Sequence, residues 1–297
     1  MKRFKRILLV WGGDTPVSAL LPWCRCVAEA SQVEGVDSLW CRNAVVPEYP
    51  GLELPELITD PEDNGEVLLE MMKGIPVKLM TEDGDPLRSV LLHLAGGTYD
   101  LVIVSIHDDD SRNLAERLAR KSPVGVLAVP PNSTAPPARI RLGVDFSDLS
   151  ELCLDWADAF ATLDPEKLAP REAVHVVGMP LAGKATMAIN PERLREHVRE
   201  LAGEQLREFL AKHSSKPEGW ERVLIDSQSA GEALMRRGEE VDSVLTVIGC
   251  HGRNALSIAL LGSHASEVIR RSDSAVLVVK RKNENLGFLR TLLGEAN

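Results

Sequence analysis

Apolar runs of strand length alternate with stretches of helical periodicity along most of the chain, and this order restricts the fold more than any other feature. Such alternation is typical of a parallel sheet covered by helices, because parallel neighbours need a crossover connection. Strands are expected near residues 5–11, 36–41, 76–80, 101–105, 125–129, 139–145, 172–178, 221–226, 244–249 and 275–280. Helices are expected in the second half near 149–163, 191–213, 228–238 and 263–272. We therefore predict an α/β fold with two tandem five-stranded parallel-sheet domains, each with helices on both faces in a Rossmann-like arrangement.

The chain is divided by a proline-rich segment, Pro130-Pro131-Asn132-Ser133-Thr134-Ala135-Pro136-Pro137, which can sustain neither a helix nor a central strand. The strand after this segment resembles the first strand of the chain, and later strands of the two halves match in the same order. We expect a first domain at 1–130, a linker at 131–137, a second domain at 138–281 and a tail with a short helix at 282–297. The apolar stripe of the tail is typical either of packing over the same protein or of a surface for a partner.

The composition indicates a globular, soluble protein, with 297 residues, 44% of them hydrophobic, and a formal net charge of -10. The negative charge argues against nucleic acid as a partner, because nucleic-acid-binding proteins usually present a concentrated basic face. No apolar run reaches the roughly 18 residues that span a bilayer, so no membrane partner is expected. The five cysteines are scattered without a CxxC pair, which favours reduced thiols in the cytoplasm over a disulfide framework or a zinc site.

Glycines surround one strand-to-helix connection near the C-terminus, where Gly249-Cys250-His251-Gly252 is followed by nine residues and then by Gly262-Ser263. Glycine leaves backbone amides open to an anion, and the free N–H groups and dipole at a helix N-terminus favour negative charge. The spacing therefore predicts a phosphate cradle, with the Ser263 hydroxyl as a further donor. The alternative is that the glycines only shape a tight loop and a helix cap.

Asp145 follows the first strand of the second half, as Gly249 follows the fourth, so both are expected at one crevice beyond the carboxyl ends of the strands. Asp145 is alternatively a turn or N-cap residue, because Asp-Phe-Ser-Asp would cap the next helix. His175 lies among valines and is predicted to be a partly buried, satisfied histidine rather than a ligand. His251 and Arg253 either offer charge to phosphates or are solvated loop residues.

The second half resembles the universal stress protein family through three motifs in order: Asp145-Phe146-Ser147, His175-Val176-Val177 and Gly249-x2-Gly252-x9-Gly262-Ser263. The resemblance covers roughly residues 138–281. It implies a five-stranded parallel sheet of the adenine nucleotide alpha hydrolase-like kind and ATP, with or without Mg, as the ligand. It also implies that Asp145 lies by the adenine or ribose and that the Val176 backbone contacts the adenine edge. By the same resemblance, the ribose and phosphates are lined by Gly249, Gly252, Gly262, Ser263 and the His264 amide.

The first half differs at the corresponding connection, where Ser105-Ile106-His107-Asp108 aligns with the first glycine pair and about six residues, with the Gly-Ser pair, are missing. Three carboxylates in a row, Asp108-Asp109-Asp110, would repel phosphate oxygens. We expect them at a solvated turn before a helix that starts near residue 111. The first half is therefore predicted to be a degenerate copy with a structural or partner-binding role. In a tandem chain of this family the halves can pair as separate subunits would, burying the apolar edges of both sheets.

Positive signs of catalysis are missing from the sequence. No Ser-His-Asp arrangement, metal-ligand spacing or carboxylate pair stands out, and no lysine lies between Gly249 and Ser263. We expect a cytoplasmic tandem universal stress protein whose second domain binds ATP or a related adenine nucleotide as a regulatory ligand in a stress response, with slow ATP hydrolysis at most. The expected partners are the nucleotide, an unidentified protein and, beyond the pairing of the halves, a second copy of the chain. The alternatives are a dimerisation or scaffolding protein that binds no nucleotide, and a weak ATPase.

Overall fold

The computed structural model describes residues 4–12, 17–42, 61–162, 168–178, 190–236, 244–252 and 261–294. Strands and helices alternate along this part of the chain. The strands are β1 (Arg6–Gly12), β2 (Gly35–Arg42), β3 (Val77–Asp83), β4 (Leu101–Ser105), β5 (Gly125–Val129), β6 (Arg139–Gly143), β7 (Arg171–Val177), β8 (Trp220–Asp226), β9 (Val244–Gly249) and β10 (Ala275–Val279). The helices are α1 (Val17–Ser31), α2 (Pro61–Met71), α3 (Pro86–Ala95), α4 (Asp109–Lys121), α5 (Asp148–Ala161), α6 (Pro191–His213), α7 (Ala230–Arg236), α8 (Ser263–Arg271) and α9 (Leu286–Leu292).

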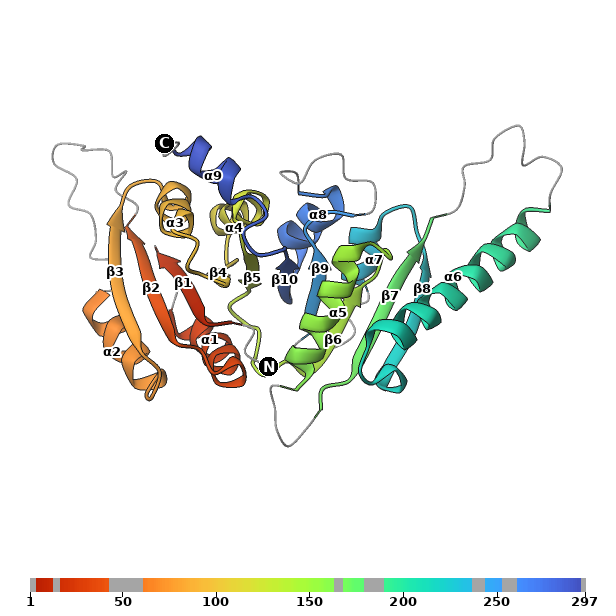
Figure 1. The fold of residues 1–297 in the computed structure, drawn as a ribbon, viewed down its shortest axis with the longest axis horizontal. Helices are drawn as coiled ribbons and strands as arrows, with labels where there is room; N and C mark the ends of the chain where they lie inside the picture. The colour runs from red at the N-terminus through yellow and green to blue at the C-terminus, as the bar shows by residue number, and fades with distance from the viewer. Residues whose placement is uncertain are drawn as a thin grey trace.

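The described strands form one continuous sheet in the order β3-β2-β1-β4-β5-β10-β9-β6-β7-β8 (Figure 1). Neighbouring strands run parallel except in the middle, where β5 and β10 are antiparallel. The predicted α/β class with a mostly parallel sheet is therefore confirmed. The two halves repeat one strand order, β3-β2-β1-β4-β5 and β8-β7-β6-β9-β10, so each contributes five strands to the sheet.

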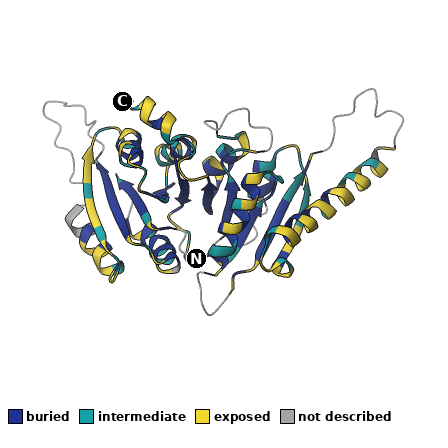
Figure 2. Ribbon diagram, in the orientation of Figure 1, coloured by how far each residue is buried: buried dark blue, intermediate teal, exposed yellow. Residues whose placement is uncertain are grey.

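The half-sheets are joined at β5 and β10, where residues 126–128 pair with residues 276–278. Both strands are buried along their whole length, whereas the outer strand β3 is largely exposed (Figure 2). Leu127 lies opposite Leu277, so equivalent residues around this seam are 150 positions apart (277 minus 127). The seam therefore relates the two halves by an approximate twofold axis. The family resemblance implied that the apolar edges of both sheets would be buried, but not that they would hydrogen-bond into a single sheet.

Aromatic packing reinforces the seam between the halves. The ring of Phe4, just before β1, lies 4.7 Å from the ring of Trp156 on α5, edge to face. A Cβ atom on Gly125 would come within 2.9 Å of the same Trp156 ring, so glycine is needed where β5 passes beneath it. The Trp23 indole N–H on α1 donates to the Ser133 hydroxyl at 3.0 Å, which ties the proline-rich segment to the first half.

Helices cover both faces of the sheet. On one face α3, α4, α8 and α7 contact one another in that order, while α1 packs against α2 and α5 against α6. The helix of the tail, α9, lies against α3, where Arg290 Nε donates to the Ala95 carbonyl at 3.1 Å and Leu289 is fully buried. Among the described residues, no helix combines the length and the apolar character that crossing a membrane would require.

Two elements begin or end away from their expected positions. The third strand continues to Asp83 although residues 81–83 are polar, because an exposed edge strand gains its backbone hydrogen bonds from β2 whatever its side chains are. Helix α4 begins at Asp109, not near residue 111, because Asp108 is its N-cap and accepts a hydrogen bond from Ser111 N at 2.7 Å.

Lys280 is a buried amine where the chain leaves β10 and meets α4, with 4% of its surface exposed. Its Nζ donates to the carbonyls of Arg120 at 3.0 Å and Ser122 at 2.8 Å and so caps the C-terminal end of α4. Burial lowers the pKa of Lys280 to about 8, although the Glu284 carboxylate and, once it is ionised, the Cys250 thiol act in the opposite direction. The unfolded chain keeps the ordinary pKa of 10.5, so between these values it binds more protons than the folded chain and stability rises with pH.

The substitution Lys280→Met is expected to remove this pH dependence. The free energy of unfolding of the wild type, measured relative to the variant, should rise by roughly 1 kcal/mol from pH 7 to pH 9. Urea denaturation at the two pH values measures this difference, and titrations common to both proteins largely cancel. If the free energy of unfolding of the wild type relative to the variant stays constant or falls from pH 7 to pH 9, the amine keeps its proton in the folded protein.

Candidate functional site

A cavity of about 640 Å³ lies at the carboxyl ends of β6, β7 and β9 and is closed by α7 and α8. The chain leaves β6 toward β7 and β8 on one side and returns to β9 on the other, so the cavity lies at a topological switch point, where open α/β sheets bind ligands. All the residues expected at the site line this cavity: Asp145, Val176, Gly249, Gly252, Gly262, Ser263 and His264. The structure thus brings together every predicted site residue.

Asp145 stands at the turn between β6 and α5, and one of its carboxylate oxygens organises that turn. Oδ1 accepts hydrogen bonds from the Ser147 N–H at 3.0 Å and from the hydroxyls of Ser147 and Ser150, both at 2.6 Å. The N-cap of α5 is Ser147, so the alternative that Asp145 itself caps the helix is wrong. Asp145 instead holds the capping serine, and its Oδ2 lies beside Gly252 at the cavity.

Two glycines of the cradle stand where a side chain would collide with its surroundings. A Cβ atom on Gly249 would come within 2.8 Å of the Leu149 side chain, and one on Gly252 within 2.9 Å of Asp145 Oδ2. The Gly262 N–H donates to the Cys250 carbonyl at 2.7 Å and closes the base of the loop, whose residues 253–260, with Arg253, lie outside the described residues. The glycines therefore shape the loop and also border the cavity.

The N-terminal end of α8 borders the same cavity through Gly262, Ser263 and His264. Gly262 is the N-cap, and no side chain of the described residues caps the helix. The first N–H groups of a helix have no partner within it, and the dipole adds partial positive charge there. The cavity thus has a wall of backbone donors that an anion can use.

The remaining walls are mainly apolar. They come from β7, β9, α7 and α8 and include Val174, Val176, Ala230, Leu234, Ile248, Leu261, Ala265 and Val268. The side chains from α7 were not expected at the site, because only the fold brings that helix over the strand ends. A flat heteroaromatic ring fits such a slot, in which few polar groups decide the orientation.

Two tilted rings pack against each other beside the cavity. Phe146 has a φ of +61°, which is rare for a bulky side chain, and its ring lies 4.4 Å from that of His175. His175 Nδ1 lies 2.8 Å from the Val144 carbonyl and must donate, because a carbonyl only accepts. His175 is thus a partly buried, hydrogen-bonded histidine, as predicted, and it also lines the cavity.

His251 contributes an unpaired polar atom. Its Nε2 is buried and forms no hydrogen bond with any residue that the structure describes, and the side chain lines the cavity. Buried polar atoms are normally paired, so this nitrogen points to a ligand atom as its partner.

The equivalent place in the first half holds a cavity of about 500 Å³ with different chemistry. Its lining includes Asp85 and Asp108, which cap α3 and α4 by accepting hydrogen bonds from Leu87 N and Ser111 N. Burial raises the pKa of Asp108, but hydrogen bonds from Ser111 and the nearby His107 together bring it below its ordinary value, so this carboxylate is charged. The Ser111 N–H at the start of α4 thus already donates to a side chain, whereas no side chain of the described residues caps α8.

A mostly parallel α/β sheet with a donor-lined cavity at its switch point is the architecture in which Rossmann-like proteins bind their ligands. Residues 138–280 match the model of the Universal stress protein family, so the C-terminal half of the chain carries a domain of that family. Universal stress protein MJ0577 of Methanocaldococcus jannaschii is 26% identical over 155 residues, which are 49% of this chain and 96% of that protein.

Solved structures share the fold over nearly the whole length. The functionally unknown protein PA1789 from Pseudomonas aeruginosa PAO1 has a TM-score of 0.66 and 21% identity, covering 99% of this chain and 98% of its own. A universal stress protein from Archaeoglobus fulgidus DSM 4304 has a TM-score of 0.55 and 20% identity, covering 93% and 96% of the two chains.

Proposed function

We propose that the C-terminal half binds ATP or a related adenine nucleotide in the cavity between β6, β9 and α8, and that the nucleotide acts as a regulatory ligand. The observation that carries this proposal is the contrast between the two equivalent helices. The N-terminus of α8 borders its cavity with no side-chain cap from the described residues, whereas α4 is closed by Asp108. Free N–H groups at a helix N-terminus favour phosphate.

Other residues of the cavity suit the remaining parts of a nucleotide. The apolar slot that includes Val176 and Ile248 matches a purine ring. Asp145 Oδ2 would accept a ribose hydroxyl, and the unpaired His251 Nε2 supplies a further polar partner. Asp145 is the one carboxylate among the described lining residues, and Mg²⁺ is often held by one carboxylate together with phosphate oxygens.

A regulatory role fits the cavity better than rapid turnover. No lysine or arginine is found among the described residues that line it. Phosphoryl transfer relies on positive charge and metal ions placed around the transferred group. A nucleotide bound without these groups would persist long enough to report its concentration to a partner that prefers the loaded form.

Titration calorimetry on the full chain tests the proposal. With ATP and Mg²⁺ we expect one nucleotide per chain, and unfolding should be stabilised by about 2.7 kcal/mol at a ligand concentration of 100 times Kd. Repeating the titration with EDTA measures what the metal contributes, and GTP serves as the control for base selectivity. If millimolar ATP gives no heat and no thermal stabilisation, the proposal is wrong, and the alternative of a scaffolding protein that binds no nucleotide is favoured. Two nucleotides per chain would contradict the asymmetry of the halves.

A further inference from the structure

Helices α4 and α8 meet across the approximate twofold axis, one from each half of the chain. The Ser266 hydroxyl on α8 donates to Glu116 Oε1 on α4 at 2.7 Å. These residues are 150 positions apart (266 minus 116), the same spacing as Leu127 and Leu277 in the sheet below. The two helices therefore occupy equivalent places and touch along their equivalent faces.

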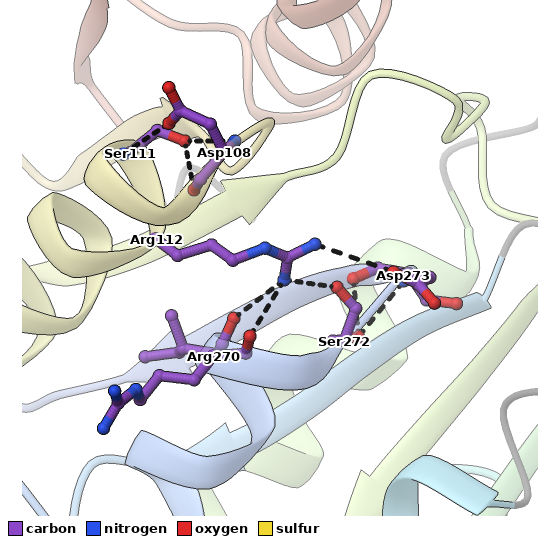
Figure 3. A network of polar contacts seen from close by, with 8 residues as sticks. Asp108, Ser111, Arg112, Arg270, Ser272 and Asp273 are labelled. Carbon is purple, nitrogen blue, oxygen red and sulfur yellow. Dashed lines mark hydrogen bonds and ion pairs between the residues drawn. The ribbon is translucent and has the colours of Figure 1, made fainter.

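Arg112 on α4 holds the C-terminal end of α8 (Figure 3). Its Nη1 donates to the carbonyls of Ile269 and Arg270, each at 3.3 Å, and of Ser272 at 2.8 Å. Its Nη2 lies 3.6 Å from the Asp273 carboxylate. The last carbonyls of a helix lack intrahelical partners and carry partial negative charge. The guanidinium therefore stabilises the seated conformation of α8, in which the helix packs against α4 and its N-terminus borders the cavity.

The opposite end of α8 is the wall of donors at the nucleotide cavity. The helix has nine residues and is about 14 Å long at 1.5 Å per residue, so Arg112 does not reach the ligand. Arg112 and a bound phosphate would act on the two ends of one short helix. Each stabilises the same seated conformation, which links their effects thermodynamically.

The equivalent carbonyls of α4 are held by a different cation. The α4 carbonyls equivalent to those of Arg270 and Ser272 belong to Arg120 and Ser122, and they accept from Lys280. The position 150 residues after Arg112 is Gly262, which has no side chain that could reach across the seam. The C-terminal half therefore holds the end of α4 with the Lys280 ammonium, whereas the N-terminal half holds the end of α8 with the Arg112 guanidinium.

We propose that Arg112 of the N-terminal half is a positioning residue for the nucleotide site of the C-terminal half. It raises the fraction of molecules in which α8 is seated with its N–H groups at the cavity, and the apparent Kd falls as that fraction rises. This proposal rests on the proposed nucleotide function. It gives the first half, which has lost the cradle, a role in ligand binding by the second.

Calorimetry on full-length variants measures the effect on binding. Arg112→Met should weaken ATP binding roughly threefold to tenfold, the range expected for losing a charge at a helix end. Arg112→Lys should recover part of the affinity, because an ammonium also donates to carbonyls. Arg117→Met removes the same charge from an exposed position of the same helix and should stay within twofold of the wild type. Equal affinities for Arg112→Met and the wild type would overturn the proposal.

Hydrogen exchange without nucleotide separates this proposal from the nucleotide function. Amides of α8 should exchange several times faster in Arg112→Met than in the wild type, while those of α5, on the far side of β9, should not change. If the wild type binds no ATP, the nucleotide function fails on its own, and faster exchange confined to α8 still supports positioning by Arg112. Unchanged exchange in α8, or equal acceleration in all helices, would contradict it.

Discussion

Arg141→Leu is expected to lower the free energy of unfolding by about 3–5 kcal/mol, because it leaves a buried carboxylate without its partner. Arg141 on β6 and Glu172 on β7 are each 1% exposed, and Nε and Oε1 are 2.5 Å apart. Arg141 Nη1 also donates to the Leu234 carbonyl at 3.0 Å and so fastens α7 over the sheet. Arg139 lies 3.8 Å from the second Glu172 oxygen and compensates part of the charge, which favours the lower end of the range.

Chemical denaturation followed by tryptophan fluorescence measures this loss. Combining Arg141→Leu with Glu172→Leu should recover much of the stability, because neither charge of this buried pair then remains. The exposed pair Arg207 and Glu204, 2.6 Å apart, provides a matched control, and Arg207→Leu should leave the midpoint nearly unchanged. If the double variant were as unstable as Arg141→Leu alone, packing rather than the unpaired charge would be the cause.

Gly252→Asp is expected to abolish nucleotide binding, with Kd rising at least ~100-fold. A Cβ atom at this position would already come within 2.9 Å of Asp145 Oδ2. The added carboxylate would face both Asp145 and the phosphates, and like charges in a partly desolvated site repel. Calorimetry with ATP and Mg²⁺ measures the loss.

Two further variants separate charge from crowding in this experiment. Gly252→Ala adds only a methyl group and should weaken binding less than Gly252→Asp. Gly287→Asp makes the same change on α9, where a Cβ atom would meet nothing within 4 Å, and should bind as the wild type does. If Gly252→Asp still binds the nucleotide, the phosphates do not bind at this loop.

Much of the candidate site was readable in advance because its signals are local in sequence. The glycine spacing and the aspartate after β6 each lie at a strand end, and parallel strands bring their carboxyl ends to one edge. The sequence leaves open whether Asp145 is a turn or an N-cap residue; the structure places it in the turn, where it holds Ser147, and Ser147 caps α5. The α7 side chains at the cavity were not predicted, because nothing in the sequence says which helix face turns toward a cavity.

The alternation of strand and helix patterns by itself determined the α/β class. The contrast between the glycines at 249, 252 and 262 and the carboxylates at 108–110 determined how the two halves differ. Only the tertiary structure decided that β5 and β10 join the halves into one sheet and that Arg112 reaches across the seam to α8. The physical reason is range: periodicity and capping act over a few residues, whereas Arg112 and Ser272 are 160 positions apart and meet only because two equivalent helices pack around one axis.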